Sequence, residues 1–226
     1  MKLSLDTGNL DEVREANRWG VLRGVTTNPT HIAKEEKDFL PLVKEICSIV
    51  DGDVSIETLS QDADVLVRQG HDIAQIADNA VVKIAMHPEG LAATRKLSDE
   101  GIKVNVTLCF NPAQALLAAE AGAYIVSPFL GRLDDIATDS MKVLSDICEI
   151  YALQGYDTQV LAASLRSPLH VVEAARLGAD IATMPFKVFQ SLVKHPLTDA
   201  GFKRFSDDWE EAKAQLGELP PSMQEA

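Results

Sequence analysis

The feature that most constrains the fold of this chain is a regular alternation of short apolar runs with longer segments of helical periodicity. Eight runs of four to six residues are mostly apolar on both faces, which is typical of strands buried inside a parallel sheet. We expect these strands at residues 3–6, 24–28, 54–58, 81–85, 104–108, 124–128, 159–164 and 181–185.

Each run is followed by a segment that is rich in helix formers. These segments cover residues 9–19, 36–50, 62–77, 88–100, 112–121, 139–153, 168–177 and 186–192. Continuous βα alternation predicts a parallel sheet with right-handed crossovers, and eight such units make a (β/α)8 TIM barrel. An open, doubly wound sheet is the alternative, but the first strand–helix connection, LDTGNLDE, lacks the GxGxxG pattern that such folds usually carry.

A further helical segment, at residues 199–215, follows the eighth unit and carries Phe202, Phe205 and Trp209 on one face. The sequence therefore predicts one α/β domain over residues 1–216, a (β/α)8 barrel with an additional C-terminal helix, and a flexible tail over 217–226. Because the barrel is closed before this helix begins, its aromatic face should cover the barrel's end or contact another subunit, so we expect a homo-oligomer.

Charge and composition argue against several classes of protein. The chain has 21 basic and 34 acidic residues, a net charge of −13, which disfavours a general nucleic-acid binder or a polybasic membrane-surface protein. A pair of arginines can still hold a small phosphate in such a protein. No window approaches the ~20 apolar residues of a membrane span, and the N-terminus lacks a signal peptide, so we expect a cytoplasmic protein.

Polar side chains gather at the C-terminal ends of the expected strands, where TIM barrels carry their active sites. Lys83 is the most informative, because it lies within the apolar run VVKIAM. A buried lysine tends to lose its charge, and a neutral amine attacks carbonyl groups. The alternative is that Lys83 extends to solvent or pairs with a buried acid.

Two carboxylates, Asp6 and Glu57, also end expected strands. Near one lysine they would suit acid–base work at separate steps, although each could instead form a structural salt bridge. A metal site is less favoured. Two carboxylates without neighbouring histidines would suit only Mg²⁺ or Mn²⁺, and the lysine would repel the ion.

Two arginines follow late strands, where barrels frequently bind phosphate. Arg132 follows the sixth strand, and Ser164 and Arg166 follow the seventh. The planar guanidinium fork suits a phosphate group, but pairing of an arginine with Asp134 or Asp135 is the alternative.

Longer stretches of the sequence resemble the transaldolase family. The similar stretches are LDT at 5–7, GVTTNP at 24–29, VVKI at 81–84, GIKVNVTL at 101–108, AGAYIVSPFLGRLDD at 121–135 and VLAASLRSP at 160–168. The small, single-barrel branch is further indicated by PFKV at 185–188 and HPLTDAGFKRFSDDW at 195–209.

The resemblance implies an enzyme that works through a lysine Schiff base without a metal or cofactor. It implies that Lys83 forms the imine, that Asp6 handles the proton of the hydroxyl at the cleaved bond, and that a catalytic water is positioned by Glu57 and Thr107. It further implies that the dihydroxyacetone part is bound by Asn28, Asn105 and Ser127, and the phosphate by Arg132, Ser164 and Arg166. A decamer of two stacked pentamers is typical of this branch.

A sister branch acts as a fructose-6-phosphate aldolase and has Gln at the position of Glu57 and Tyr at that of Phe129. The residues here therefore favour a transaldolase, since phenylalanine lacks the proton donor of a phenol. Ala85, His87 and Asn111 depart from the family's usual residues, and His87 is more typical of a helix flank than of a catalyst.

Three functions remain open from the sequence. A transaldolase would move a dihydroxyacetone unit from sedoheptulose 7-phosphate or fructose 6-phosphate to glyceraldehyde 3-phosphate or erythrose 4-phosphate in the pentose phosphate pathway. An aldolase would release free dihydroxyacetone. A barrel can also bind sugar phosphates without catalysis, although the set Asp6, Glu57, Lys83 and Thr107 argues against that.

Overall fold

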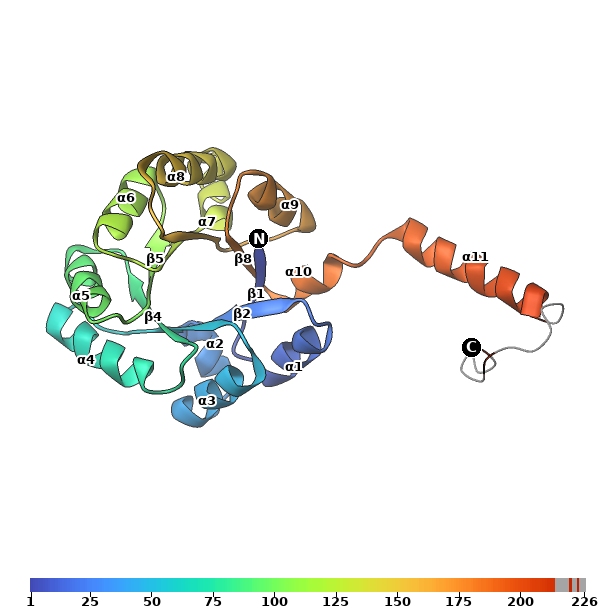
Figure 1. Cartoon of the computed structure of the whole chain (residues 1–226), viewed down its shortest axis with the longest axis horizontal. Coiled ribbons are helices and arrows are strands. Elements are labelled where there is room, and N and C mark those ends of the chain that lie inside the picture. Colours follow the sequence, from blue (N-terminus) through green and yellow to red (C-terminus); the bar gives the residue numbers. More distant parts are fainter. Residues whose placement is uncertain (214–219, 221–222, 224–226) are drawn as a thin grey trace. The chain divides into compact units, whose positions relative to one another are not determined.

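Eight parallel strands form a closed barrel in the computed structural model of the chain, which describes residues 1–213, 220 and 223 (Figure 1). The strands follow chain order, and β8 pairs with β1 to close the sheet. The (β/α)8 fold is thereby confirmed. The strands are β1 (Lys2–Asp6), β2 (Leu22–Thr26), β3 (Asp53–Glu57), β4 (Ala80–Ala85), β5 (Val104–Cys109), β6 (Ile125–Pro128), β7 (Gln159–Ala162) and β8 (Ile181–Met184).

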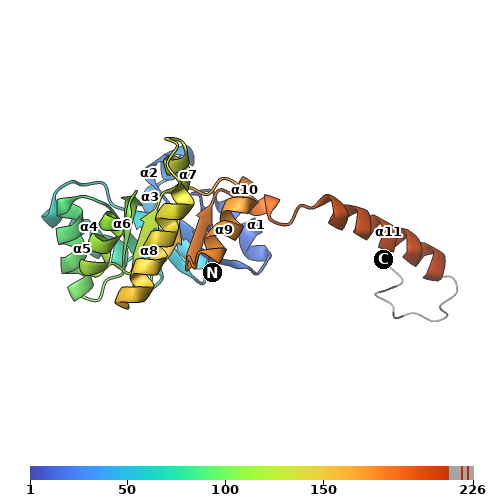
Figure 2. The ribbon, with the colours of Figure 1, turned by 90° about the horizontal axis from the view of Figure 1, so that it is seen from above.

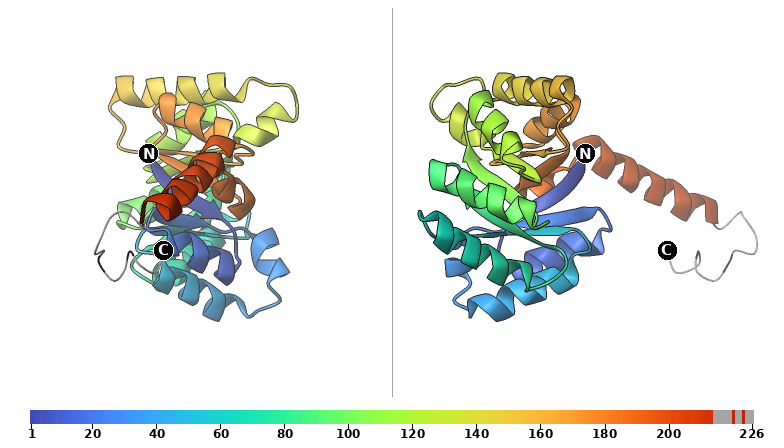
Figure 3. Two further views of the ribbon diagram at one scale, coloured as in Figure 1. Left: turned by 90° about the vertical axis from the view of Figure 1, so that its right-hand side faces the viewer. Right: turned by 60° about the vertical axis from the view of Figure 1, so that its left-hand side comes forward.

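Helices surround the barrel on its outer side (Figures 1 and 3). The helices around the barrel are α1 (Leu10–Arg18), α2 (Pro29–Lys34), α3 (Phe39–Ile49), α4 (Ala63–Ala74), α5 (Pro88–Asp99), α6 (Pro112–Glu120), α7 (Leu130–Asp134), α8 (Ser140–Gln154) and α9 (Pro168–Arg176). A further helix, α10 (Phe186–Ser191), follows β8. The sequence predicted neither of the short helices α2 and α7. Figure 2 shows both at the same end of the barrel, beyond the strands that precede them.

The interior of the barrel is polar at this end. The hydroxyls of Thr26 on β2 and Thr183 on β8 lie 2.7 Å apart, and Nδ2 of Asn105 on β5 donates to Oγ of Ser55 on β3 at 3.0 Å. Each pair comes from strands that are separated by one strand, so their side chains meet only inside the barrel. On β4, the fully buried Ile84 alternates with the inward Lys83 and faces α5, where a Cβ atom at Gly90 would come 3.1 Å from it.

Four of the helices around the barrel begin with a capping side chain followed directly by proline. Asn28 caps α2, His87 caps α5, Asn111 caps α6 and Ser167 caps α9, and each accepts a hydrogen bond from a backbone N–H of the first turn. Proline suits the first helical position because its missing N–H would have no partner there. The unusual residues His87 and Asn111 are therefore helix caps. Nδ1 of His87 accepts from the Gly90 N–H at 3.1 Å.

The chain divides into two compact units, Met1–Phe189 and Gln190–Ala226. The second contains α11 (Pro196–Lys213), which begins at Pro196 rather than at 199. Phe202 and Phe205 of this helix are 75% and 63% exposed. The single domain over 1–216 stays a prediction, and the predicted tail at 217–226 falls outside the described residues except at 220 and 223. Among the described helices, none combines the length and hydropathy that a bilayer span requires.

Candidate active site

A pocket of about 410 Å³ opens at the C-terminal ends of the strands. Its lining comes from all eight strands or their following loops, as expected for a barrel whose strand ends converge. Of the residues that the sequence singled out, those that line it are Asp6, Asn28, Glu57, Lys83, Ser127, Arg132 and Ser164. Asn105, Thr107 and Arg166 lie outside this lining.

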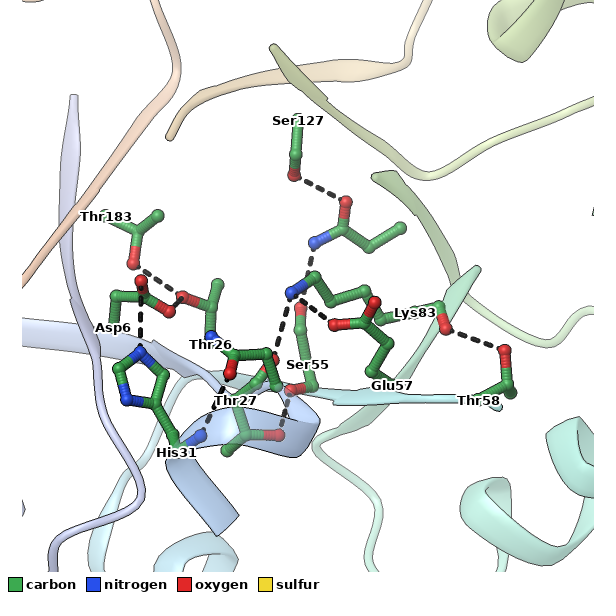
Figure 4. A network of polar contacts seen from close by, with 12 residues as sticks. Asp6, Thr26, Thr27, His31, Ser55, Glu57, Thr58, Lys83, Ser127 and Thr183 are labelled. Atoms are coloured by element: carbon green, nitrogen blue, oxygen red, sulfur yellow. Dashed lines mark hydrogen bonds and ion pairs between the residues drawn. The ribbon is translucent and has the colours of Figure 1, made fainter. Parts of the chain in front are cut away.

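Lys83 occupies the centre of a short network of polar contacts (Figure 4). Its Nζ donates to Oε2 of Glu57 and to the backbone carbonyl of Thr27, each at 3.0 Å. The side chain of Lys83 is 5% exposed and that of Glu57 is 16% exposed. The amine is therefore inside the barrel and is paired with an acid, the alternative that the sequence had left open.

Asp6 ends β1 and lies in the same pocket. Its Oδ1 accepts from Oγ1 of Thr26 at 3.0 Å, and its Oδ2 lies 3.4 Å from Nε2 of His31. Burial raises the pKa of Asp6, but the hydrogen bond and charge of His31, the charge of Lys83 and the hydrogen bond from Thr26 outweigh burial. The net result is a pKa below the ordinary value for aspartate, so Asp6 is ionised near neutral pH.

Asn105 is fixed by two hydroxyls and is fully buried. Oγ of Ser127 donates to its Oδ1 at 2.7 Å, while its Nδ2 donates to Oγ of Ser55 at 3.0 Å. Because the first bond occupies the oxygen and the second occupies the nitrogen, the amide has one orientation. Ser127 also lines the pocket, so its hydroxyl connects the buried Asn105 to the pocket wall.

Thr107 is fully buried on β5, and its Oγ1 has no hydrogen-bond partner among the described residues. It is paired in register with Ala85, two residues beyond Lys83 on β4. A buried hydroxyl without a partner is costly, so such groups in native proteins usually serve a purpose.

The two arginines have different surroundings. Arg132 lines the pocket, with its guanidinium carbon 5.0 Å from the ring centre of Phe129. Arg166 instead forms two hydrogen bonds with the carboxylate of Asp135, the alternative that the sequence had allowed. The contact with Asp135 raises the pKa of Arg166. Arg166 also lies against Gly131, where a Cβ atom would come 2.5 Å from its Nε.

Two residues at the pocket have left-handed backbone conformations. Leu108 has φ of 57° and Ser164 has φ of 61°, and neither is glycine. Such conformations cost free energy for residues that have a Cβ atom, and they concentrate at functional sites. Both residues line the pocket, which supports its assignment as the functional centre.

The sequence did not single out Thr26, His31, Ser55 or Thr183. A signal existed for Ser55, because the polar residues Asp53, Ser55 and Glu57 alternate along DVSIE and would share one face of a strand. Thr26 and Thr183 gave no such alternation. His31 gave no such signal, since α2 is too short to show helical periodicity. Among the described residues, no cluster of three His, Cys, Asp or Glu side chains could hold a metal ion.

Comparison with known proteins agrees with this geometry. The family model described as "Transaldolase/Fructose-6-phosphate aldolase" matches residues 3–219. The chain is 56% identical over 216 residues to a probable transaldolase of Thermoanaerobacter sp. (strain X514), covering 96% of this chain and all of the relative. It is 55% identical to a probable transaldolase of Aquifex aeolicus, covering 93% and 97%, and 54% identical to probable transaldolase 1 of Listeria monocytogenes, covering 94% and 100%.

Proposed function

Because this chain belongs to the transaldolase/fructose-6-phosphate aldolase family, we propose that it is a transaldolase that transfers a dihydroxyacetone unit between sugar phosphates. The observation that carries the proposal is the buried amine of Lys83, which has an acid partner 3.0 Å away and shares its pocket with Asp6. The donor is a ketose phosphate such as sedoheptulose 7-phosphate or fructose 6-phosphate, and the acceptor is glyceraldehyde 3-phosphate or erythrose 4-phosphate, as in the pentose phosphate pathway.

The first step is attack of Nζ of Lys83 on the ketone carbon of the donor. Attack needs a neutral amine, and Oε2 of Glu57 at 3.0 Å is positioned to accept the ammonium proton. Nζ forms a bond to the ketone carbon, and the ketone oxygen takes one proton from Nζ and one back from Glu57. It then leaves as water, and a protonated imine remains. Thr107 and Glu57 hold this water, a role supported by the unpartnered buried hydroxyl of Thr107.

The second step is cleavage of the bond between the third and fourth carbons of the donor. Asp6 removes the proton of the hydroxyl on the fourth carbon, and the electron pair of the breaking bond moves to the imine nitrogen. An aldose phosphate leaves, and an enamine of three carbons stays on Lys83. The lowered pKa of Asp6 keeps it ionised and able to accept this proton.

The third step reverses the second with a different aldehyde. The enamine carbon attacks the acceptor, the acceptor oxygen takes the proton from Asp6, and water hydrolyses the imine to release the new ketose phosphate. In this proposal Asn28, Asn105 and Ser127 bind the hydroxyls of the three-carbon unit, which is supported by Asn28 and Ser127 in the pocket lining and by the hydrogen bond that joins Ser127 to Asn105. Arg132, Ser164 and Arg166 bind the phosphate.

The alternative within the family is an aldolase that releases free dihydroxyacetone. Glu57 and Phe129 favour transfer, since Phe129 offers no proton to the enamine from the pocket wall. Cleavage of fructose 6-phosphate at full rate without an acceptor would favour the aldolase instead.

We also propose that the enzyme is a cytoplasmic homo-oligomer, and more specifically a decamer. The support from this chain is the pair Phe202 and Phe205, which α11 leaves largely exposed. Exposed aromatic rings of this size favour association in water. Light scattering tests this proposal, and a monomer at micromolar concentration would contradict it.

Borohydride trapping tests the function. Incubation with fructose 6-phosphate and borohydride should add a three-carbon unit to Lys83, located by peptide mass spectrometry. The Lys83→Met variant should lose both trapping and transfer. Lys103→Met is the matched control, because Lys103 is 44% exposed and pairs with Asp53 outside the pocket. An active enzyme with an unmodified Lys83 would refute the proposal.

A further inference from the structure

His31 is held in place by the backbone around it. It lies in the first turn of α2, where its N–H donates to the capping oxygen of Asn28 at 3.0 Å. The β1–α1 connection packs against the same residue, because a Cβ atom at Gly8 would come 3.1 Å from the His31 carbonyl oxygen. The backbone that carries the imidazole is therefore fixed, and His31 lines the pocket wall.

The imidazole meets the free side of the Asp6 carboxylate (Figure 4). Nε2 of His31 lies 3.4 Å from Oδ2, and both side chains are 25% exposed. Thr26 binds the other oxygen, Oδ1, at 3.0 Å. The contact with His31 is at the outer limit of a hydrogen bond, and catalytic contacts of this kind often shorten when substrate binds.

We propose that His31 is a positioning residue, whose Nε2–H donates to Oδ2 of Asp6 and prevents the carboxylate from rotating away from the substrate hydroxyl. This inference rests on the proposed function, in which Asp6 accepts the hydroxyl proton. With Thr26 on one oxygen and His31 on the other, each oxygen is fixed and still keeps a lone pair for the substrate. The carboxylate is then oriented before the donor sugar binds.

The charged groups around Asp6 and His31 determine how kcat depends on pH. Glu57, Lys83 and Arg132 line the same pocket, while Glu12 binds Thr7 and Glu35 binds Asn9 on the neighbouring elements. The interaction with His31 is among the causes that keep the pKa of Asp6 low. Loss of this interaction should therefore raise the pKa of Asp6 and move the acidic limb of the kcat profile to higher pH.

Three substitutions at His31 separate the hydrogen bond from packing. His31→Leu removes the donor, so kcat for transfer should fall about tenfold, which corresponds to about 1.4 kcal/mol. The amide nitrogen of Gln reaches the position of Nε2, whereas that of Asn reaches the position of Nδ1. His31→Gln should therefore restore most of kcat and reverse part of the shift in the acidic limb, since glutamine replaces the hydrogen bond but not the charge of His31. His31→Asn should resemble His31→Leu. The KM for fructose 6-phosphate should change by less than about twofold in all three.

The control variant is His71→Leu. His71 also contacts a carboxylate, with Nε2 2.6 Å from Oε2 of Glu100, but neither residue lines the pocket. This variant should keep the wild-type pH profile. Borohydride trapping of Lys83 should persist in every His31 variant, which also reports that the barrel is folded.

The outcomes separate this inference from the proposed function. If the wild-type enzyme neither transfers nor traps at Lys83, the proposed function fails. If the wild type does both and His31→Leu keeps its kcat and pH profile, the positioning role of His31 is overturned. A His31→Asn variant that recovers as well as His31→Gln would overturn it too, because the donor would then not act from the position of Nε2.

Discussion

Nζ of Lys83 and Oε2 of Glu57 lie 3.0 Å apart because the two residues are direct partners in the register of β3 and β4. The sequence offered two interpretations of Lys83, a nucleophile or the partner of a buried acid, and this contact makes them compatible. A carboxylate at this distance neutralises the buried cation and is also the nearest acceptor for its proton. The same carboxylate can therefore pair with the amine and accept its proton before attack.

Asp6→Asn should separate formation of the imine from cleavage of the carbon–carbon bond. The amide cannot accept the hydroxyl proton, so transfer should slow by about 100-fold or more, while Lys83 still reacts with the ketone. Borohydride should then trap an intact six-carbon phosphate adduct in place of the three-carbon unit, as intact-mass spectrometry would show. Loss of all trapping in this variant would mean that Asp6 acts before the imine forms.

The lowered pKa of Asp6 also predicts how stability depends on pH. An aspartate with a pKa lower in the folded state than in the unfolded chain contributes stability above its unfolded pKa, and that contribution disappears as the pH falls through the folded pKa. The difference in unfolding free energy between the wild type and Asp6→Asn should be constant above about pH 5 and shift against the wild type below about pH 4. Urea unfolding from pH 2.5 to 7 measures this difference. A wild-type advantage that grows on acidification would contradict the assignment.

Phe129→Tyr should increase release of free dihydroxyacetone. The ring of Phe129 lines the pocket, and a phenol there would add a proton donor near the enamine on Lys83. We expect acceptor-independent cleavage of fructose 6-phosphate to rise several-fold, measured by enzymatic detection of dihydroxyacetone. Phe110→Tyr is the control, because Phe110 packs against Phe129 at 6.0 Å but does not line the pocket. An equal rise in both variants would refute the explanation.

Asp135→Asn should release Arg166 for the substrate phosphate. Asp135 occupies both terminal nitrogens of this guanidinium, and a phosphate would have to compete with it. We expect the KM for phosphorylated donors to fall several-fold with little change in kcat, measured by steady-state assay. Asp146→Asn, which breaks the exposed pair with Lys142, should leave KM unchanged. A rise in KM for Asp135→Asn would show that Asp135 holds Arg166 in its productive position.

The strand ends carried most of the information that the sequence held about this site. Lys83, Asp6 and Glu57 were identified because each interrupts a short apolar run, and strand order in a barrel brings such ends together. The sequence did not predict the polar side chains inside the barrel, Thr26, Ser55 and Thr183, because these runs were interpreted as apolar on both faces. The alternation of polar residues in VSIE, with Ser55 two residues before Glu57, already places both on one face.

The contacts between loops and short helices were beyond the reach of the sequence. The approach of His31 to Asp6 depends on α2, whose six residues are too few to show periodicity. The choice of Asp135 as the partner of Arg166 depends on α7, which has five residues. Two candidate carboxylates, Asp134 and Asp135, are adjacent in sequence, and only the direction of a helical turn distinguishes them: Asp134 instead lies 3.6 Å from His170.

The proline-capped helices limit how this enzyme can be redesigned. Only one residue separates the end of β2 from its cap Asn28, the end of β4 from His87, and the end of β5 from Asn111. An insertion at these three connections would uncouple a helix from its cap and shift a strand end that supports the chemistry. Libraries that seek new substrates should therefore exchange side chains there and leave the lengths of these three connections unchanged.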